Sequence, residues 1–414
     1  MYQGLMRMAS VLCMAATTCM PWAAHAQSDP IRIGFLTVRS GALAAGGKQM
    51  EEGIQLFLKE RNYTLAGRKV ELIIADTGGN PAGAKTKAQD LVERSRVHVV
   101  IGPLAAFEAI AIDDYLRQTR TPTVSCSAAA EDLTQRKLNP WFVRTVGTSA
   151  QSNHALGEYA AKTLGYKRMA VIADDIAYGH EMCAGFMRVF EELGGKVVQR
   201  LFPPLTVPDY GTYLAQLKTN IDGVFLGFAG SNGFRYLRQF NEYGLRGKVT
   251  PVGGMTALDE AVLRNMGDEA LGIVTSCWYS AEIENAINKR FVANFRVDWG
   301  YDPGFYAAAT YTEAAVLEAT LNAIKGNVED KQAFMKTVRG IKVDTCRGPV
   351  QFDRYGNVVG NIYIRKVERR DGRLVNRVIQ TYPNVSQFWT YKPEEFLKNP
   401  VYSRDFPPAK NLEP

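Results

Sequence analysis

The sequence predicts an α/β protein built from two doubly wound parallel-sheet lobes that are joined by a multi-strand hinge. Three observations support this fold class. The 414 residues are too many for one hydrophobic core. Short apolar strands alternate with helical patterns over most of the chain, which is typical of parallel sheets covered by helices on both faces. The alternation restarts near Ser149, so we expect two such sheets.

The first run of elements predicts lobe I. The expected strands are residues 31–36, 70–75, 97–101 and 121–125. Between the first two strands, Met50, Ile54, Phe57 and Leu58 fall on one face of a helix. A second helix is expected over residues 84–93, and a third between the strands 97–101 and 121–125. This order of elements is βαβαβαβ, which indicates a parallel sheet.

The second run predicts lobe II. The expected helices are residues 150–164, 179–193, 210–219 and 231–243. The expected strands are residues 168–173, 197–202, 223–228, 249–253 and 272–277. Helices around 285–295 and 305–324 have no strand between them, so we expect them to return and cover the first sheet. Short strands around 350–353, 361–365 and 374–380 are expected at the edge of the second sheet.

These patterns divide the chain into four parts. Residues 1–26 form a signal peptide, 27–147 with 278–347 form lobe I, 148–277 with 348–383 form lobe II, and 384–414 form a C-terminal tail on the surface. Several chain crossings between the lobes suit a clamshell that closes about a hinge. Because ligands of open α/β sheets lie beyond the carboxyl ends of the strands, the cleft between the lobes is the expected site.

The N-terminus has the features of a secretory signal peptide. Arg7 is the only charged side chain before Asp29, and an apolar run follows it. Ala24-His25-Ala26 is a small-x-small cleavage site, so cleavage is expected after Ala26. The apolar run is too short for the roughly 20 residues of a membrane span. Cys13 and Cys19 lack the context of a lipoprotein. We therefore expect a periplasmic protein without a lipid anchor.

Composition argues against nucleic acid and metal as partners. The net charge is +7, but Glu368 interrupts the longest basic cluster, residues 365–370. The basic stripe of a nucleic-acid-binding protein is therefore missing. The cysteines after the signal peptide are Cys126, Cys183, Cys277 and Cys346. They contain no CxxC spacing, which disfavours a zinc site. An oxidising compartment permits three full disulfide pairings, and four buried free thiols are equally compatible with the sequence.

The motifs of common enzyme classes are also missing. The chain contains no HExxH, GxSxG or GxGxxG pattern. Residues 41–48 resemble a phosphate loop, but Gly47 stands where its Lys belongs. His98 lies in an apolar strand, and His154 and His180 have no paired ligand spacing. Scattered triads stay compatible with the sequence, but these patterns favour a binding protein without a cofactor over an enzyme.

Several segments, taken in order, carry a resemblance to a known family. They are residues 31–36 with Ser40-Gly41, residues 101–105, residues 125–130 with Leu133-Thr134, Tyr178-Gly179, residues 237–239 and residues 347–353. In this order they resemble the leucine/isoleucine/valine-binding proteins, the type I periplasmic binding proteins of ABC importers. The resemblance implies a monomeric clamshell that closes over a small molecule and delivers it to an inner-membrane ABC permease.

The resemblance also implies which residues of lobe I bind the ligand. They come from two loops, Leu104, Ala105, Ala106 and Phe107, and Ser127, Ala128 and Ala129. Both loops are expected to precede helices, so that free N–H groups and the positive end of a helix dipole would face a carboxylate.

Departures from the family pattern narrow the ligand class. Met255 stands where the resemblance implies a Glu for an α-ammonium group, and Ala105, Ala106 and Ala129 replace hydroxyl residues. An unpaired buried ammonium group would cost several kcal/mol. The small residues at 229–233 leave room for a larger ligand, and the stretch 228–233 resembles the branch that binds aromatic carboxylates.

We therefore predict a carboxylate on the lobe I amides, with an apolar or aromatic body in lobe II. The residues predicted to surround this body are Tyr178, Phe228, Ala229, Gly230, Met255 and Thr256 of lobe II, with Phe107 and Tyr306 of lobe I. Apolar burial and aromatic packing would supply much of the affinity. Three alternatives stay open: a binder of branched-chain amino acids or amides in the same transporter class, a sensory ligand-binding protein, and a periplasmic enzyme.

Overall fold

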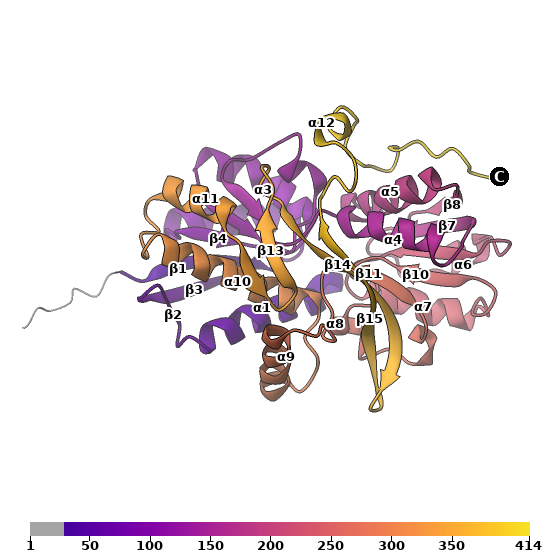
Figure 1. The fold of residues 1–414 in the computed structure, drawn as a ribbon, viewed down its shortest axis with the longest axis horizontal. Helices are drawn as coiled ribbons and strands as arrows, with labels where there is room; N and C mark the ends of the chain where they lie inside the picture. The colour runs from indigo at the N-terminus through magenta and orange to yellow at the C-terminus, as the bar shows by residue number, and fades with distance from the viewer. Residues whose placement is uncertain (1–28) are drawn as a thin grey trace, which may run out of the picture.

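The computed structural model describes residues 29–414 and has two lobes, each built around one sheet (Figure 1). The predicted signal peptide lies outside the described residues. Lobe I is on the left of Figure 1 and lobe II on the right, with late strands of the chain between them. This arrangement confirms the predicted fold class of two parallel-dominated sheets covered by helices.

Lobe I contains a six-stranded sheet in the order β2-β3-β1-β4-β5-β6. Its strands are β1 (Ile31–Thr37), β2 (Thr64–Leu65), β3 (Arg68–Asp76), β4 (Val99–Ile101), β5 (Thr123–Ser125) and β6 (Phe142–Arg144). All neighbours are parallel except β2 and β3, which form a short hairpin. β2 and β6 are too short for the periodicity of the sequence to reveal.

Helices from two distant parts of the chain cover the lobe I sheet. They are α1 (Ala44–Lys59), α2 (Pro81–Gln89), α3 (Ala106–Gln118), α9 (Ala286–Trp299), α10 (Phe305–Ala323) and α11 (Lys331–Gly340). The return of the late helices to the first sheet is confirmed, because α10 packs along α1. At this contact the Tyr311 ring lies 5.1 Å from that of Phe57 and 4.3 Å from that of Phe291.

Lobe II contains a nine-stranded mixed sheet. Its parallel part has the order β11-β10-β9-β7-β8, with β7 (Arg168–Ala173), β8 (Lys196–Leu201), β9 (Gly223–Gly227), β10 (Thr250–Gly253) and β11 (Val274–Cys277). The helices of this lobe are α4 (Gln151–Lys162), α5 (Ala177–Glu192), α6 (Gly211–Gln216), α7 (Asn232–Glu242) and α8 (Glu260–Leu263). Most of these elements agree with the predicted ones to within two residues at each end, whereas α6 is three residues shorter at its end and α8 was not predicted.

The late strands join the edge of this sheet at β11, as predicted. They are β12 (Val343–Thr345), β13 (Gly348–Phe352), β14 (Val358–Arg370) and β15 (Arg373–Val385), all antiparallel to their neighbours. β14 and β15 are longer than the predicted strands. β14 extends beyond its prediction at both ends, and β15 continues past residue 380 to pair with the start of β14. β12 contacts α10, and β13 contacts α11, so this sheet extends to the helices of lobe I.

The C-terminal tail packs against both lobes. Phe388, Phe396 and Tyr402 are buried beside Ala150 and Ala184, which lie at the start of α4 and on α5. The short helix α12 (Pro393–Phe396) belongs to this segment. From lobe I, the guanidinium of Arg136 donates hydrogen bonds to main-chain carbonyls of the tail. The tail therefore lies beside the hinge, in contact with both lobes.

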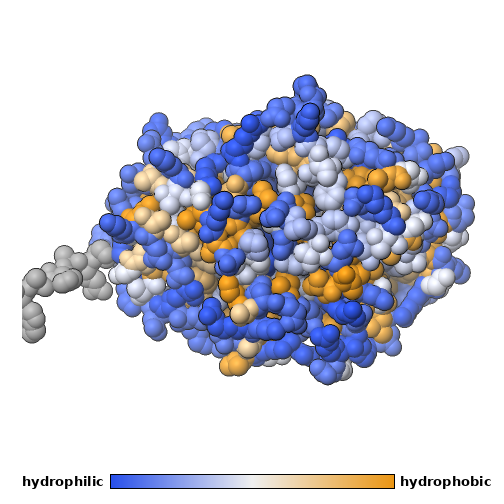
Figure 2. All heavy atoms as spheres, in the orientation of Figure 1, coloured by the Kyte–Doolittle hydropathy of each residue, from blue (hydrophilic) through white to orange (hydrophobic). Residues whose placement is uncertain are grey.

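The surface and the buried thiols agree with a globular protein. Figure 2 shows hydrophilic side chains over most of one face, with hydrophobic side chains in smaller groups near its middle. Cys126, Cys183, Cys277 and Cys346 are all free and buried, which corresponds to the second of the two alternatives left open by the sequence. Within residues 29–414, no helix has the length and apolar character needed to cross a membrane.

Candidate ligand-binding site

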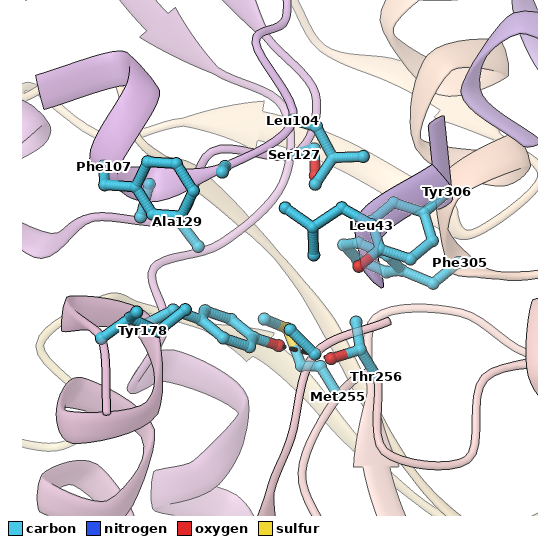
Figure 3. A pocket seen from close by; sticks show the side chains of 14 residues that line it. Leu43, Leu104, Phe107, Ser127, Ala129, Tyr178, Met255, Thr256, Phe305 and Tyr306 are labelled. Carbon is cyan, nitrogen blue, oxygen red and sulfur yellow. Dashed lines mark hydrogen bonds between the residues drawn. The ribbon is translucent and has the colours of Figure 1, made fainter. Parts of the chain in front are cut away.

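A cavity lies between the two lobes, at the carboxyl ends of their parallel strands (Figure 3). Its empty space, including part of the mouth, amounts to ≈ 420 Å³. The residues that line it are Leu43, Leu104, Ala105, Ala106, Phe107, Ser127, Ala129, Ile176, Tyr178, Ala229, Met255, Thr256, Phe305 and Tyr306. These lining side chains are uncharged, and most of them are apolar. A ligand here would meet hydrogen-bond donors and acceptors, but no counter-charge.

The start of α3 forms one wall of the cavity. Leu104 to Phe107 follow β4, and α3 begins at Ala106. The N–H of Ala105 is already occupied, because it donates to a carboxylate oxygen of the buried Glu108 at 3.0 Å. The N–H groups of Ala106 and Phe107 belong to the first turn, where an α-helix supplies no partner. The prediction of free amides on this loop is therefore wrong for Ala105 and stays a prediction for Ala106 and Phe107.

The second loop of lobe I differs from the prediction in two ways. Ser127 and Ala129 line the cavity, whereas Ala128 is fully buried outside its lining. The loop leads only to a short 3-10 turn, Glu131–Thr134, so it has no α-helix dipole. The carbonyls of this loop are held by the buried Arg144, which donates to the oxygen of Ala128 at 3.3 Å. Burial lowers the pKa of Arg144 to about 10. Its hydrogen bond to the carbonyl of Ala128 holds the loop on the side away from the cavity.

Lobe II contributes the opposite wall. Figure 3 shows Tyr178, Met255 and Thr256 below the open space, facing Ser127 and Ala129 of lobe I. The hydroxyl groups of Tyr178 and Thr256 lie 2.9 Å apart. Burial raises the pKa of the Tyr178 hydroxyl, which keeps it neutral. This wall therefore combines an aromatic face, a thioether and two linked hydroxyl groups.

Besides Ala128, two residues of the predicted site, Phe228 and Gly230, lie outside the cavity lining. The ring of Phe228 points into the core of lobe II, 5.0 Å from the ring of Tyr236 and 5.4 Å from that of Tyr210. Phe228 is therefore a core residue in this structure, because its strand ends in an aromatic cluster. Gly230 lies against the carbonyl of Ala42 from lobe I and closes the cleft beside the cavity.

The structure also adds lining residues that the sequence analysis did not select. Leu43 comes from the turn before α1, Ile176 precedes α5, and Phe305 begins α10 beside the predicted Tyr306. Leu43 follows Ser40-Gly41, one of the segments that carried the family resemblance. That segment could therefore have pointed to Leu43 as a lining residue. Ile176 and Phe305 had no signal, because their roles depend on how distant elements meet.

Contacts across the cleft describe a closed arrangement of the lobes. The N–H of Phe305 donates to the carboxylate of Asp259 at 2.6 Å, and the N–H of Ser231 donates to the carbonyl of Ala42 at 3.3 Å. The guanidinium of Arg264 lies 3.8 Å from the centre of the Tyr301 ring. Since each pair joins lobe I to lobe II, the lobes touch around the cavity.

Asp174 anchors the lobe II loop beside the cavity and makes stability depend on pH. Its carboxylate accepts hydrogen bonds from the N–H of Ala229 and the amide of Asn232, both at 2.7 Å. Burial raises its pKa from 3.8 to about 7. The folded state thus holds a proton that the unfolded chain releases, so this group stabilises the fold below about pH 4 and loses that contribution as pH rises through 7.

We expect the wild type to lose up to about 4 kcal/mol of unfolding free energy from this one group between pH 4 and 7, because each pH unit corresponds to about 1.4 kcal/mol. Asp174→Asn should lack this pH-dependent contribution. The difference in unfolding free energy between the variant and the wild type should therefore change steadily between pH 4 and 7. Urea unfolding of both proteins at several pH values measures it. If plots of unfolding free energy against pH were parallel for the two proteins, Asp174 would not titrate between pH 4 and 7.

Comparison with known proteins agrees with this architecture. A family model described as "Periplasmic binding protein" matches residues 30–373, most of the chain. The chain belongs to the periplasmic binding protein family. A curated relative, the Leu/Ile/Val-binding protein homolog 6 of Brucella abortus, is 27% identical over 370 residues, which cover 87% of this chain and 93% of the relative.

Two solved structures are similar to this periplasmic binding protein over nearly their whole length. A solute-binding protein of an ABC transporter from Rhodopseudomonas palustris BisB5, in complex with 3,4-dihydroxybenzoic acid, is 33% identical with a TM-score of 0.83. It covers 86% of this chain and 98% of its own. A second, from Rhodopseudomonas palustris HaA2 in complex with p-hydroxybenzoic acid, is 28% identical with a TM-score of 0.82 and covers 87% and 99%.

The family assignment confirms the resemblance found in the sequence. It also confirms that this is a binding protein of the ABC-transporter type rather than an enzyme, acting on small molecules in the periplasm. The individual ligand-binding residues stay predictions, as do the lobe boundaries, the cleavage site and the monomeric state.

Proposed function

We propose that this periplasmic binding protein captures an aromatic carboxylate by closure of its two lobes and delivers it, as a monomer, to an inner-membrane ABC permease. The observation that carries the proposal is the cavity itself: its lining side chains are uncharged and largely apolar, and the first turn of α3 opens onto one wall. An aromatic ring would bury its faces against Phe107, Tyr178 and Met255.

The carboxylate would be held by N–H groups rather than by a counter-ion. We expect the amides of Ala106 and Phe107, in the first turn of α3, to fill this role together with the hydroxyl of Ser127, since all three residues line the cavity. The α-ammonium group of an amino acid would find no carboxylate among the lining side chains, since Met255 occupies the place where the family pattern implies a Glu. The benzoate derivatives bound by two similar proteins support the same ligand class.

A thermal-shift and calorimetric screen tests the proposal. Benzoate and 4-hydroxybenzoate should raise the melting temperature of the mature protein, because a ligand at a hundredfold excess over Kd stabilises the folded state by roughly 2.7 kcal/mol. Leucine, isoleucine and valine should produce no shift at the same concentration. A shift with leucine and none with the aromatic acids would contradict the proposal and would favour the amino-acid alternative suggested by the names of the curated relatives.

A further inference from the structure

The hydroxyl groups on the lobe II wall form a hydrogen-bond chain that ends on a main-chain carbonyl. Thr256 Oγ1 lies 2.9 Å from the carbonyl oxygen of Phe228 and 2.9 Å from Tyr178 Oη. A carbonyl oxygen only accepts, so the single hydroxyl proton of Thr256 is donated to Phe228. The proton of Tyr178 must then be donated to Thr256. Tyr178 Oη therefore has lone pairs left but no free proton.

This direction gives the wall a chemical preference. Tyr178 Oη can accept a hydrogen bond from a ligand, but it cannot donate one without breaking its bond to Thr256. A ligand group that carries a proton, such as a phenolic hydroxyl, would complete the chain as ligand to Tyr178 to Thr256 to Phe228. A group with lone pairs alone, such as an ether oxygen, would face the lone pairs of Tyr178 and gain nothing.

The position of Tyr178 relates this preference to one end of the ligand. Figure 3 shows its ring on the lobe II side of the cavity, across the open space from Ser127 and Phe107. A carboxylate on the N–H groups at the start of α3 would therefore direct the far end of its ring toward lobe II. The ring position opposite the carboxylate is the one that would meet Tyr178 Oη.

We propose that Tyr178 is a specificity-determining residue that accepts a hydrogen bond from a ring hydroxyl opposite the ligand carboxylate, with Thr256 as the positioning residue that fixes Tyr178 as an acceptor. This inference rests on the proposed function, because it presupposes an aromatic carboxylate in the cavity. A site built to bond one polar group discriminates against the analogue that lacks it, because the protein atom is then left without its partner.

The first test compares two ligands of nearly equal size by calorimetry. 4-Hydroxybenzoate donates a proton, whereas 4-fluorobenzoate has none to donate. The wild type should bind the hydroxyl compound at least tenfold more tightly, and Tyr178→Phe should bring the ratio of the two Kd values close to one. Using the ratio removes any general change in affinity that the substitution causes. Tyr243→Phe, at an exposed tyrosine on the outer end of α7, is the matched control and should keep the wild-type ratio.

The second test reverses the polarity and does not depend on Tyr178→Phe folding well. Thr256→Val removes the acceptor of the Tyr178 proton, so Tyr178 becomes free to donate. 4-Methoxybenzoate and 4-ethylbenzoate have similar shapes, but only the first offers an oxygen. The wild type should bind them equally, and Thr256→Val should bind the methoxy compound several-fold more tightly, whereas Thr256→Ser should behave as the wild type.

A control for both tests is Tyr306→Phe, which removes the other tyrosine hydroxyl of the cavity lining. In this variant the ratio of Kd values for each ligand pair should stay as in the wild type.

The outcomes separate this inference from the proposed function. If benzoate binds but the hydroxyl compound shows no advantage, or if the advantage survives in Tyr178→Phe, the role of Tyr178 is wrong and the aromatic-carboxylate function stands. A wild-type advantage that disappears in Tyr306→Phe would assign the discrimination to Tyr306 and overturn the role of Tyr178. If none of these acids binds and leucine does, the proposed function fails, and the inference fails with it.

Discussion

Gly230→Ala is expected to weaken ligand binding by about a hundredfold while both lobes stay folded. Gly230 has φ of +56°, and a Cβ there would lie 2.0 Å from the carbonyl oxygen of Ala42, which belongs to the other lobe. The added methyl group therefore obstructs the closed form and removes the hydrogen bond from Ser231 to Ala42. An open form, with the lobes apart, would lack this contact. A hundredfold loss corresponds to about 2.7 kcal/mol of closure free energy.

Calorimetry measures the affinity, and small-angle scattering with saturating ligand measures whether the lobes still close. Gly244→Ala is the matched control, because Gly244 has φ of +65° with no atom within 4 Å of its Cβ position. The two variants carry the same cost of placing a side chain at positive φ, about 1–2 kcal/mol, and only one obstructs closure. Equal affinities for the two variants would show that the Ala42 contact does not form in the bound state.

Met255→Glu is expected to reduce the affinity for aromatic carboxylates by a hundredfold or more. Met255 is 1% exposed and lines a cavity without charged side chains. A Glu there would place a second negative charge in the cavity that holds the ligand carboxylate, and two like charges separated by roughly a benzene ring, about 6 Å, repel by about 3 kcal/mol at an effective dielectric constant near 20. Burial of the new carboxylate adds a desolvation cost.

Met255→Gln separates charge from shape, because Gln has almost the same size as Glu and no charge. Calorimetry from pH 5 to 8 should show that the Glu variant regains affinity at low pH, where its side chain becomes protonated, whereas the Gln variant stays constant. Equal losses in both variants at every pH would mean that Met255 acts through its shape alone and that the carboxylate binds far from it.

The order and type of the main elements could be predicted because they depend on local periodicity. The strand over 31–36 and the helix that carries Met50 and Ile54 follow from patterns within a dozen residues. The return of α10 to lobe I was predicted from the absence of a strand between two helices. β6 and β12, of three residues each, were not predicted, although the equally short β4 and β5 were found within longer expected strands.

The candidate site was predicted in outline rather than in detail. The two loops of lobe I, Tyr178, Met255 and Tyr306 all reach the same cavity. Phe228 does not line it. It directly follows β9, which ends one residue earlier than predicted, and its ring packs with those of Tyr210 and Tyr236 in the core of lobe II. The direction of a side chain after a strand depends on such packing neighbours, which local periodicity does not identify.

The sequence by itself determined the two-sheet architecture, the cleft between the lobes and the absence of an acidic residue at Met255, because each of these depends on local pattern or on residue identity. The tertiary structure decided which N–H groups stay free, where Gly230 meets Ala42 and in which direction Tyr178 donates its proton. These features depend on contacts of a few ångströms between segments far apart in the chain, and only the packing of the complete fold determines such contacts.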